Sequence, residues 1–231
     1  MLVLGIETAT AQPSVAIGSQ EGIIAASSIS RGSNADAFLL PTISYLMEKA
    51  DVSYRNISSI AVGIGPGLYT GMRVGVTTGK TLAQALSIPI SAVSSLDLLA
   101  FSIRHTEKLI CPVIDAKRGE VFFSFYRSVP GGITRVDEYQ VATSDGLVAE
   151  LEGTPEHTIL VGQGSLMYRD ELEEAGEVEF ASPSHAYPRA ESLVDVAVQR
   201  AYREDFDLLN EVQPMYMRRS DAELNWEAKR G

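Results

Sequence analysis

The sequence is poor in the residues that form disulfides and bind metals. Its 231 residues include one cysteine, Cys111, and three histidines, His105, His157 and His185. A single cysteine excludes an intramolecular disulfide and suits a reducing compartment, so we expect a cytoplasmic protein. The histidines are scattered through segments expected to be loops and helix ends, where solvated side chains are more common than metal ligands. We therefore expect no metal site in this chain.

Positive charge is also scarce. Lys and Arg number 19 against 30 Asp and Glu, which gives a formal net charge of −11. Such an acidic surface repels phosphate backbones, so direct and unaided binding of nucleic acid is not expected, and a basic partner is the natural complement. No run approaches the ~20 apolar residues that a membrane helix needs. No basic flank precedes an apolar run, so a signal peptide is not expected either.

Apolar residues make up 45% of the chain, enough to bury a substantial core. Apolar runs and turn residues first predict three strands, at residues 1–6, 14–18 and 23–29. Helices and strands then alternate, with helices at 34–50, 69–86 and 96–104 and strands at 57–64 and 89–93. A similar order recurs, with three strands at residues 109–114, 120–126 and 133–141, a helix at 144–151, a strand at 158–161 and a helix at 166–175. A longer helix follows at 189–204.

Three antiparallel strands followed by strand–helix crossovers form a ribonuclease-H-like unit. The repeated order therefore predicts an α/β fold of two tandem ribonuclease-H-like lobes, the architecture of the actin, sugar-kinase and Hsp70 superfamily. We divide the chain into lobes at residues 1–105 and 106–231, with the C-terminal tail packing back on the first lobe.

The stretch GIGPGLYTGMRVGVTTGKT, residues 63–81, looks like a phosphate-binding sequence. A P-loop needs a glycine four residues before Gly-Lys-Ser/Thr, and that position is Val74. The first two glycines of the dinucleotide fingerprint can be placed, but its third position falls on Thr70. Both matches miss by one residue, so we do not expect a nucleotide loop here.

A helix over residues 71–86 explains these glycines better. Its polar residues form one strip, and its apolar or small residues cover an arc of roughly 200°, about twice what one sheet requires. An interior glycine costs a helix roughly 0.5–1 kcal/mol relative to alanine, so glycines spaced four apart indicate a closely approaching element. That element is either the protein's own sheet or a partner's helix, and the wide arc favours the partner. The predicted partner interface comprises Gly71, Met72, Gly75, Val76, Gly79 and Ala83.

The preceding helix extends this predicted interface. Phe38 and Tyr45 lie beside polar residues, and aromatic residues on a polar face indicate a contact surface. The alternative is an aromatic pair folded over its own helix. Pro41 predicts a kink. The opposite face is interpreted as core and comprises Leu39, Leu40, Ile43, Leu46, Met47 and Ala50.

Four segments, spread in order over nearly the whole chain, resemble one family. They are GIETAT after the first strand, GxGPGxxTGxRxG at residues 63–75, IDAKRGEVFFSFY at 114–126 and PMYMRR at 214–219. They resemble the TsaB (YeaZ) family. The resemblance implies the two-lobed fold and a role in making threonylcarbamoyladenosine, a tRNA modification beside the anticodon. The sequence departs from the family pattern at Glu7, where relatives usually carry aspartate, and at residues 68–69, where Leu-Tyr replaces Ser-Phe.

The resemblance further implies that this chain does no chemistry and needs no cofactor. The catalytic subunit is a larger paralogue, TsaD, which binds metal and the threonylcarbamoyl-adenylate, and an ATPase, TsaE, joins the assembly. ATP and metal are thus expected on the partner subunits. Helices of the first lobe form the contact with TsaD, and the same helices allow a homodimer. Contact with tRNA is expected to be only indirect.

The alternative is a metallopeptidase-like or sugar-kinase-like enzyme with its own activity. The paralogue's His-x-x-x-His metal motif would fall on Ser95 and Leu99, and neither residue type is a good ligand. A sugar kinase of this fold would use carboxylates at the ends of the first strands, here Glu7 and Asp115, but the chain lacks the insertions that a sugar pocket needs. A vestigial nucleotide contact through Glu7, Thr8 and Asp115 stays open, as does a stand-alone binding module.

Overall fold

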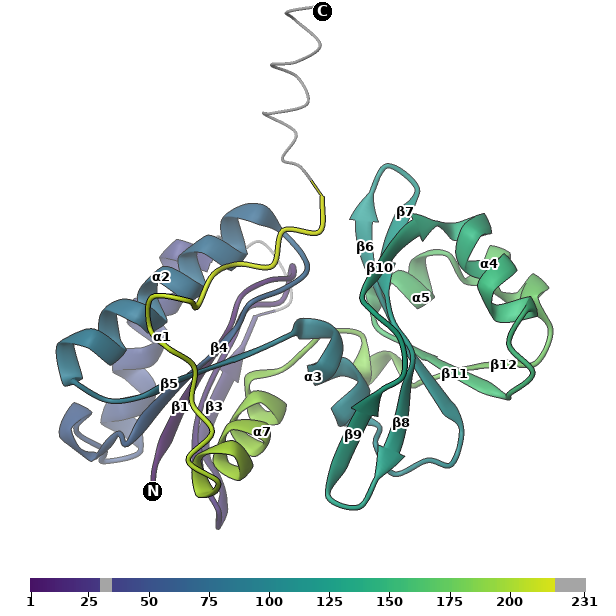
Figure 1. The fold of residues 1–231 in the computed structure, drawn as a ribbon. Helices are drawn as coiled ribbons and strands as arrows, with labels where there is room; N and C mark the ends of the chain where they lie inside the picture. Colours follow the sequence, from purple (N-terminus) through teal and green to yellow (C-terminus); the bar gives the residue numbers. More distant parts are fainter. Residues whose placement is uncertain (30–34, 219–231) are drawn as a thin grey trace, which may run out of the picture.

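The computed structural model describes residues 1–29 and 35–218, and Figure 1 shows two lobes side by side. The first lobe is built on a five-stranded sheet in the order β3-β2-β1-β4-β5. Strand β1 pairs antiparallel with β2 and parallel with β4. Its strands are β1 (Val3–Glu7), β2 (Ser14–Ser19), β3 (Gly22–Ser28), β4 (Ser59–Gly63) and β5 (Ile90–Val93).

Helices cover both faces of this sheet, which is why its central strands are apolar on both sides. On one face, α1 (Ala35–Lys49) and α2 (Tyr69–Leu86) pack against Leu4, Ile6 and Ile60. On the other face, α7 (Ala190–Tyr202) packs against Val3, Ala16 and Ala61, together with a residue of α3 (Ser95–Ser102). A short 3-10 helix, η1 (Tyr54–Asn56), precedes β4.

The second lobe repeats the strand order of the first. In the order β10-β7-β6-β11-β12, strand β6 takes the place that β1 has in the first sheet. The pairs on one side of β6 (β6–β7 and β7–β10) are antiparallel, and those on the other side (β6–β11 and β11–β12) are parallel. The strands are β6 (Leu109–Lys117), β7 (Glu120–Phe123), β10 (Gln140–Thr143), β11 (Thr158–Val161) and β12 (Val178–Phe180). The predicted fold class, two tandem ribonuclease-H-like lobes, is confirmed.

Several elements of the second lobe differ from the prediction. The strand predicted at residues 133–141 is two strands, because a hairpin of β8 (Tyr126–Val129) and β9 (Gly132–Arg135) is inserted between β7 and β10. The helix predicted at 166–175 is broken, and β12 was not predicted. The helical segments are α4 (Ser144–Glu152), α5 (Gln163–Met167), α6 (Arg169–Leu172), η2 (Glu173–Ala175) and η3 (Pro183–His185).

The last helix does not follow our division of the chain into lobes. We assigned residues 189–204 to the second lobe, whereas α7 packs on the first sheet against β1, β2 and β4. Its buried face is made of small and branched residues, and Val194 approaches both Gly5 and Gly18 closely. A Cβ built at Gly5 would lie 2.9 Å from Val194 Cγ2, so the glycine permits the close approach of this helix.

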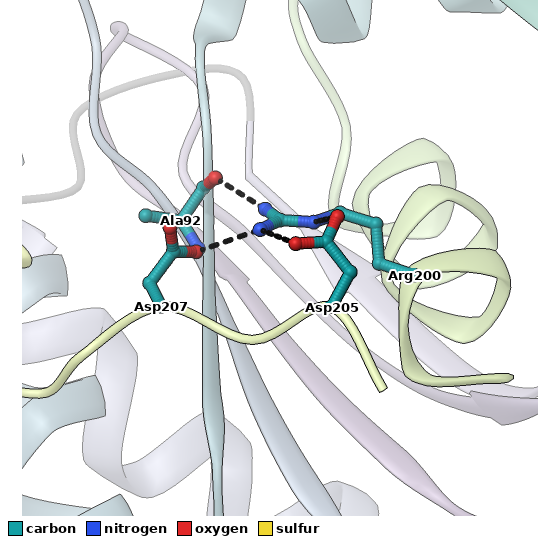
Figure 2. A network of polar contacts seen from close by, with 4 residues as sticks. All are labelled: Ala92, Arg200, Asp205 and Asp207. Carbon is teal, nitrogen blue, oxygen red and sulfur yellow. Dashed lines mark hydrogen bonds and ion pairs between the residues drawn. The ribbon is translucent and has the colours of Figure 1, made fainter. Parts of the chain in front are cut away.

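The segment after α7 runs back along the first lobe (Figure 1), and Arg218 near its end donates to Glu120 of the second lobe at 2.7 Å. Figure 2 shows its first anchor, where Arg200 pairs with Asp205 and with Asp207 at 3.1 Å and donates to the Ala92 carbonyl oxygen at 2.9 Å. Further on, the Met215 amide donates to the Ile64 carbonyl oxygen. The described part of the tail therefore packs on the first lobe.

Within residues 1–29 and 35–218, none of the helices is both long enough and apolar enough to cross a bilayer.

Candidate functional site between the lobes

The first strand of each lobe carries a carboxylate near its end. Glu7 is the last residue of β1, and its side chain has no exposed surface. Its Oε1 accepts a hydrogen bond from the Ala9 amide at 2.6 Å, and its Oε2 accepts one from Ser95 Oγ at 2.9 Å. Gly63 leaves the space for it, since a Cβ there would lie 1.9 Å from Glu7 Oε2. Burial raises the pKa of Glu7 to about 7, and the hydrogen bonds to its carboxylate partly offset this rise.

Thr8 likewise turns inward. Its Oγ1 donates to the Gly71 carbonyl oxygen at 2.7 Å and thereby joins the end of β1 to the start of α2. Only 1% of Thr8 is exposed. Of the three residues predicted as a vestigial nucleotide contact, Glu7 and Thr8 are thus engaged inside the first lobe.

Asp115 is the predicted residue that does line a cavity. It accepts hydrogen bonds from the Lys117 amide at 2.8 Å and from Lys117 Nζ at 2.7 Å. A cavity of about 100 Å³ lies between the lobes, and Asp115, Lys117, Thr10 and Gln163 are among its lining residues. Within the described residues, Thr10 Oγ1 and Gln163 Oε1 are buried without a hydrogen-bond partner. Sequence reasoning did not identify these two polar atoms.

Of two other cavities, the first shares lining residues with this one and the second shares none. The first, of about 160 Å³, is lined by Tyr69, Asp115, Lys117 and Tyr216 among others. The second, of about 470 Å³, lies between α3, the β8–β9 hairpin and α7. Asp97, on its wall, accepts hydrogen bonds from the hydroxyls of Tyr126 and Tyr139, at 2.7 and 3.0 Å, and burial raises the pKa of Asp97. Nothing in the sequence pattern had drawn attention to this carboxyl.

The predicted glycine interface on α2 is wrong. Cβ atoms built at Gly71 and Gly75 would lie 2.1 Å from the Thr8 carbonyl oxygen and 2.2 Å from Thr8 Oγ1. One built at Gly79 would lie 2.2 Å from Val62 Cγ1. The glycine stripe therefore meets β1 and β4 of the same lobe. Met72, Val76 and Ala83 are also buried, at most 3% exposed, and cannot contact a partner.

The two aromatic residues of α1 do not share a surface. Phe38 is 6% exposed and belongs to the core, whereas Leu40, which we had assigned to the core, is 58% exposed. A helical wheel of α1 does not show which of its sides the sheet covers, so it could not separate the roles of these two residues. Tyr45 is 57% exposed and is the one residue of the predicted interface that solvent reaches.

The residues considered for metal binding have other roles. Ser95 holds Glu7, and Leu99 is fully buried in the core. His185 contacts Ser102 Oγ through Nδ1 at 3.2 Å. No group of three or more His, Cys, Asp or Glu side chains with metal-binding geometry occurs in the described ranges. Cys111 lies in the core of the second lobe.

The repeated strand order, and the paired strand ends that face one cleft, define the class of two-lobed proteins that includes sugar kinases and actin-like ATPases. A hexokinase of the ROK type from Thermus thermophilus shares this fold, with a TM-score of 0.52 and 12% identity over 88% of this chain and 99% of that one. The YeaZ structure from Pseudomonas aeruginosa superposes much better, with a TM-score of 0.81 and 24% identity over 94% of this chain and 99% of that one.

Sequence comparison narrows the class to a family. A family model described as TsaD, tRNA N6-adenosine threonylcarbamoyltransferase, matches residues 34–226. The tRNA threonylcarbamoyladenosine biosynthesis protein TsaB of Bacillus subtilis is 30% identical over 228 residues, which cover 98% of each chain. The chain belongs to the TsaB (YeaZ) family, whose members are named for the biosynthesis of threonylcarbamoyladenosine in tRNA.

Proposed function

We propose that this chain is a non-catalytic subunit of the cytoplasmic assembly that forms threonylcarbamoyladenosine beside the anticodon of tRNA. It binds and supports the catalytic paralogue TsaD, together with TsaE, and ATP and metal are held by those partners. Family membership over almost the full length supports the pathway. The observation that carries the non-catalytic role is the buried carboxyl of Glu7: its two oxygens accept hydrogen bonds from the Ala9 amide and the Ser95 hydroxyl, whereas a general acid or base has to reach its substrate.

The two cavities beside Asp115 support the same conclusion, whereas the cavity of about 470 Å³ between α3, the β8–β9 hairpin and α7 is lined by neither Glu7 nor Asp115. The cavities beside Asp115 measure about 100 and 160 Å³. Pockets that enclose a small-molecule ligand usually measure about 300–1,000 Å³. A whole nucleotide therefore does not fit either cavity with the lobes in this arrangement. Of the predicted vestigial nucleotide contact, we propose only the part formed by Asp115 and its neighbours.

The outer face of α1 is the surface that we propose for the partner. Ala37, Leu40, Pro41 and Tyr45 are all exposed there, and Leu40 and Tyr45 have more than half of their surface in solvent. Lys49 Nζ lies 5.7 Å from the centre of the Tyr45 ring. An exposed apolar surface with a central aromatic residue is suited to a protein contact, and the same surface can serve a second copy of the chain.

Size-exclusion chromatography with the cognate TsaD tests this proposal. Leu40→Asp places a charge at an apolar position of the face that is 58% exposed, and it should weaken co-elution by about tenfold or more, as expected for a residue that dominates an interface. Leu208→Asp is the matched control, because Leu208 is 62% exposed but lies on the C-terminal segment. Both variants should unfold at the temperature of the wild type.

Two results would count against the proposal. If the wild-type chain and TsaD elute separately at micromolar concentration, the chain is a binding module for some other partner. If Leu40→Asp and Tyr45→Ala both bind TsaD like the wild type, the contact does not use α1.

A further inference from the structure

The cavity between α3, the β8–β9 hairpin and α7 is separate from the paired strand ends, and we call it the α3–α7 cavity. Its volume of about 470 Å³ lies within the range of about 300–1,000 Å³ that is usual for pockets enclosing a small-molecule ligand. It shares no lining residue with the two cavities beside Asp115. In Figure 1, α3, α7 and the hairpin lie at the lower side of the molecule, whereas the turn that joins β6 and β7 lies at its upper side.

Both lobes contribute apolar residues to the wall of the α3–α7 cavity. Val93 comes from the end of β5, Phe101 from α3 and Val196 from α7. Val129 and Ile133 come from the β8–β9 hairpin of the second lobe. Such a wall favours a ligand with an apolar body, because binding removes the apolar surfaces of both from water.

Asp97 is the carboxyl on the wall of this cavity. Its Oδ1 alone accepts the hydrogen bonds from the hydroxyls of Tyr126 and Tyr139. Within the described ranges, Oδ2 accepts no hydrogen bond and Asp97 forms no ion pair, and Arg135 acts on it only as a more distant charge. A largely buried carboxylate without a cation beside it is stabilised by an ammonium group placed against it.

Two of the three arginines on the wall already have carboxylate partners. Arg200 pairs with Asp205 and Asp207 (Figure 2). Arg135 pairs with Glu138 at 3.8 Å and also lies over a tyrosine ring. These two guanidinium groups are therefore compensated within the chain.

Arg203, the C-cap of α7, is the third arginine on the wall and has no such partner. It is exposed, and it makes no hydrogen bond or ion pair with the described residues. The hydrogen bond from Arg200 is the main cause that lowers the pKa of Asp205, and the charge of Arg203 is the smallest cause. The exposed amide of Gln199, one turn earlier on α7, likewise makes no hydrogen bond in this part of the chain. The charged groups of the wall that lack an ion-pair partner are thus one carboxylate and one guanidinium.

We propose that the α3–α7 cavity binds a small zwitterion with an apolar body, either an amino acid with an apolar side chain or a short apolar peptide. The ammonium group of the ligand faces Asp97, its carboxylate faces Arg203, and its apolar part covers the wall. A purely anionic ligand would place negative charge beside Asp97, and a purely cationic one would place positive charge beside Arg203. A ligand with both charges is therefore the best complement. The inference goes beyond the proposed function and does not depend on it.

Isothermal titration calorimetry of the full chain tests this site. The zwitterionic probes are leucine, phenylalanine and the dipeptide leucyl-leucine, each also in an N-acetylated form without the ammonium group and in an amidated form without the carboxylate. At least one zwitterion should bind at a single site. Blocking either of its ends should weaken binding about tenfold or more, because a charge-assisted hydrogen bond is lost there. Tighter binding of a single amino acid than of the dipeptide identifies a free amino acid as the ligand, and the reverse order identifies a peptide.

Variants assign each end of the ligand to its residue. Asp97→Asn keeps the shape of the side chain and should weaken binding of the zwitterion about tenfold, but not that of the N-acetylated form, which has no ammonium group to lose. Arg203→Gln should weaken binding of the zwitterion in the same way, but not that of the amidated form. Arg55→Gln makes the same change at an exposed position in η1, outside the cavity, and should have no effect. Because Arg203 is exposed, its variant should unfold at the temperature of the wild type, and it keeps the test decisive if Asp97→Asn does not fold.

Three results would overturn the inference. These are the absence of binding by every zwitterion at millimolar concentration, equal affinity for the blocked and unblocked forms, and wild-type affinity in both the Asp97→Asn and the Arg203→Gln variant. TsaD takes no part in these titrations, so their failure is distinct from a failure of co-elution, which contradicts the proposed function alone.

Discussion

Glu7 is a carboxylic acid without exposed surface, held by one backbone amide and one serine hydroxyl. Sequence reasoning placed it at the end of the first strand, because a short apolar run predicts a strand whatever surrounds it. It could not find Ser95, which lies far along the chain and reaches Glu7 only when β5 and α3 are in place. Nor could it show that Gly63 makes room for the carboxyl.

The raised pKa of Glu7 predicts a pH-dependent stability. Between its unfolded pKa of about 4.5 and its folded pKa of about 7, the folded state keeps a proton that the unfolded state has lost. Stability contributed by the protonated group is therefore fully present below pH 4.5 and falls as the pH rises to 7, by about 3 kcal/mol in total.

Urea unfolding at pH 5 and pH 8 measures this effect. Glu7→Gln removes the titrating group and keeps the shape of the side chain, so the free energy of unfolding of the variant should fall less between these pH values than that of the wild type. An equal fall in both proteins would show that Glu7 is ionised throughout the range.

Among the elements, α2 shows what a helical pattern predicts and what it leaves undecided. The apolar arc and the three glycines predicted a helix approached closely by a second element, and the helix at Tyr69–Leu86 is there. The identity of that element depends on how the chain folds around the helix, and a helical wheel does not contain this information. The sheet covers the glycine stripe, and α1 packs beside it. The same limit explains the exchanged roles of Phe38 and Leu40 on α1.

The contact of α2 with β1 predicts a large effect of one methyl group. Gly71→Ala would place a Cβ 2.1 Å from the Thr8 carbonyl oxygen, which is backbone and cannot rotate away. The variant should lose about 2 kcal/mol or more of its free energy of unfolding, within or above the usual range for an overpacked site.

A second glycine serves as the control for this measurement. Gly153, the C-cap of α4, has φ −72° and ψ −11°, and its nearest contact to an added Cβ is 3.5 Å away. Gly153→Ala should be neutral or stabilising by about 0.4–1 kcal/mol, because alanine adopts this conformation freely and restricts the unfolded chain. Equal stability of Gly71→Ala and the wild type would mean that α2 does not lie on β1 as described.

Across the whole molecule, the repeat of strand order was predictable because each lobe follows its own local pattern of strands and helices. The positions of α7 and of the tail depend on contacts between residues that lie far apart in the sequence. Val194 packs against Gly5 and Gly18, and the ion pairs of Arg200 with Asp205 and Asp207 fix the chain as it turns back (Figure 2). Within the described residues, the chain enters the second lobe at β6 and returns to the first lobe at α7. Family comparison adds the pathway, which no local pattern contains.

The central claim, a subunit that supports chemistry without performing it, is tested most directly by reconstituted formation of threonylcarbamoyladenosine on tRNA with TsaD, TsaE and this chain. Omission of the chain should abolish the product, while the cleft variants Glu7→Gln and Asp115→Asn should sustain wild-type rates, since neither carboxyl takes part in the reaction. A folded Glu7→Gln or Asp115→Asn protein that still co-elutes with TsaD but lowers the rate by a hundredfold or more would contradict the claim.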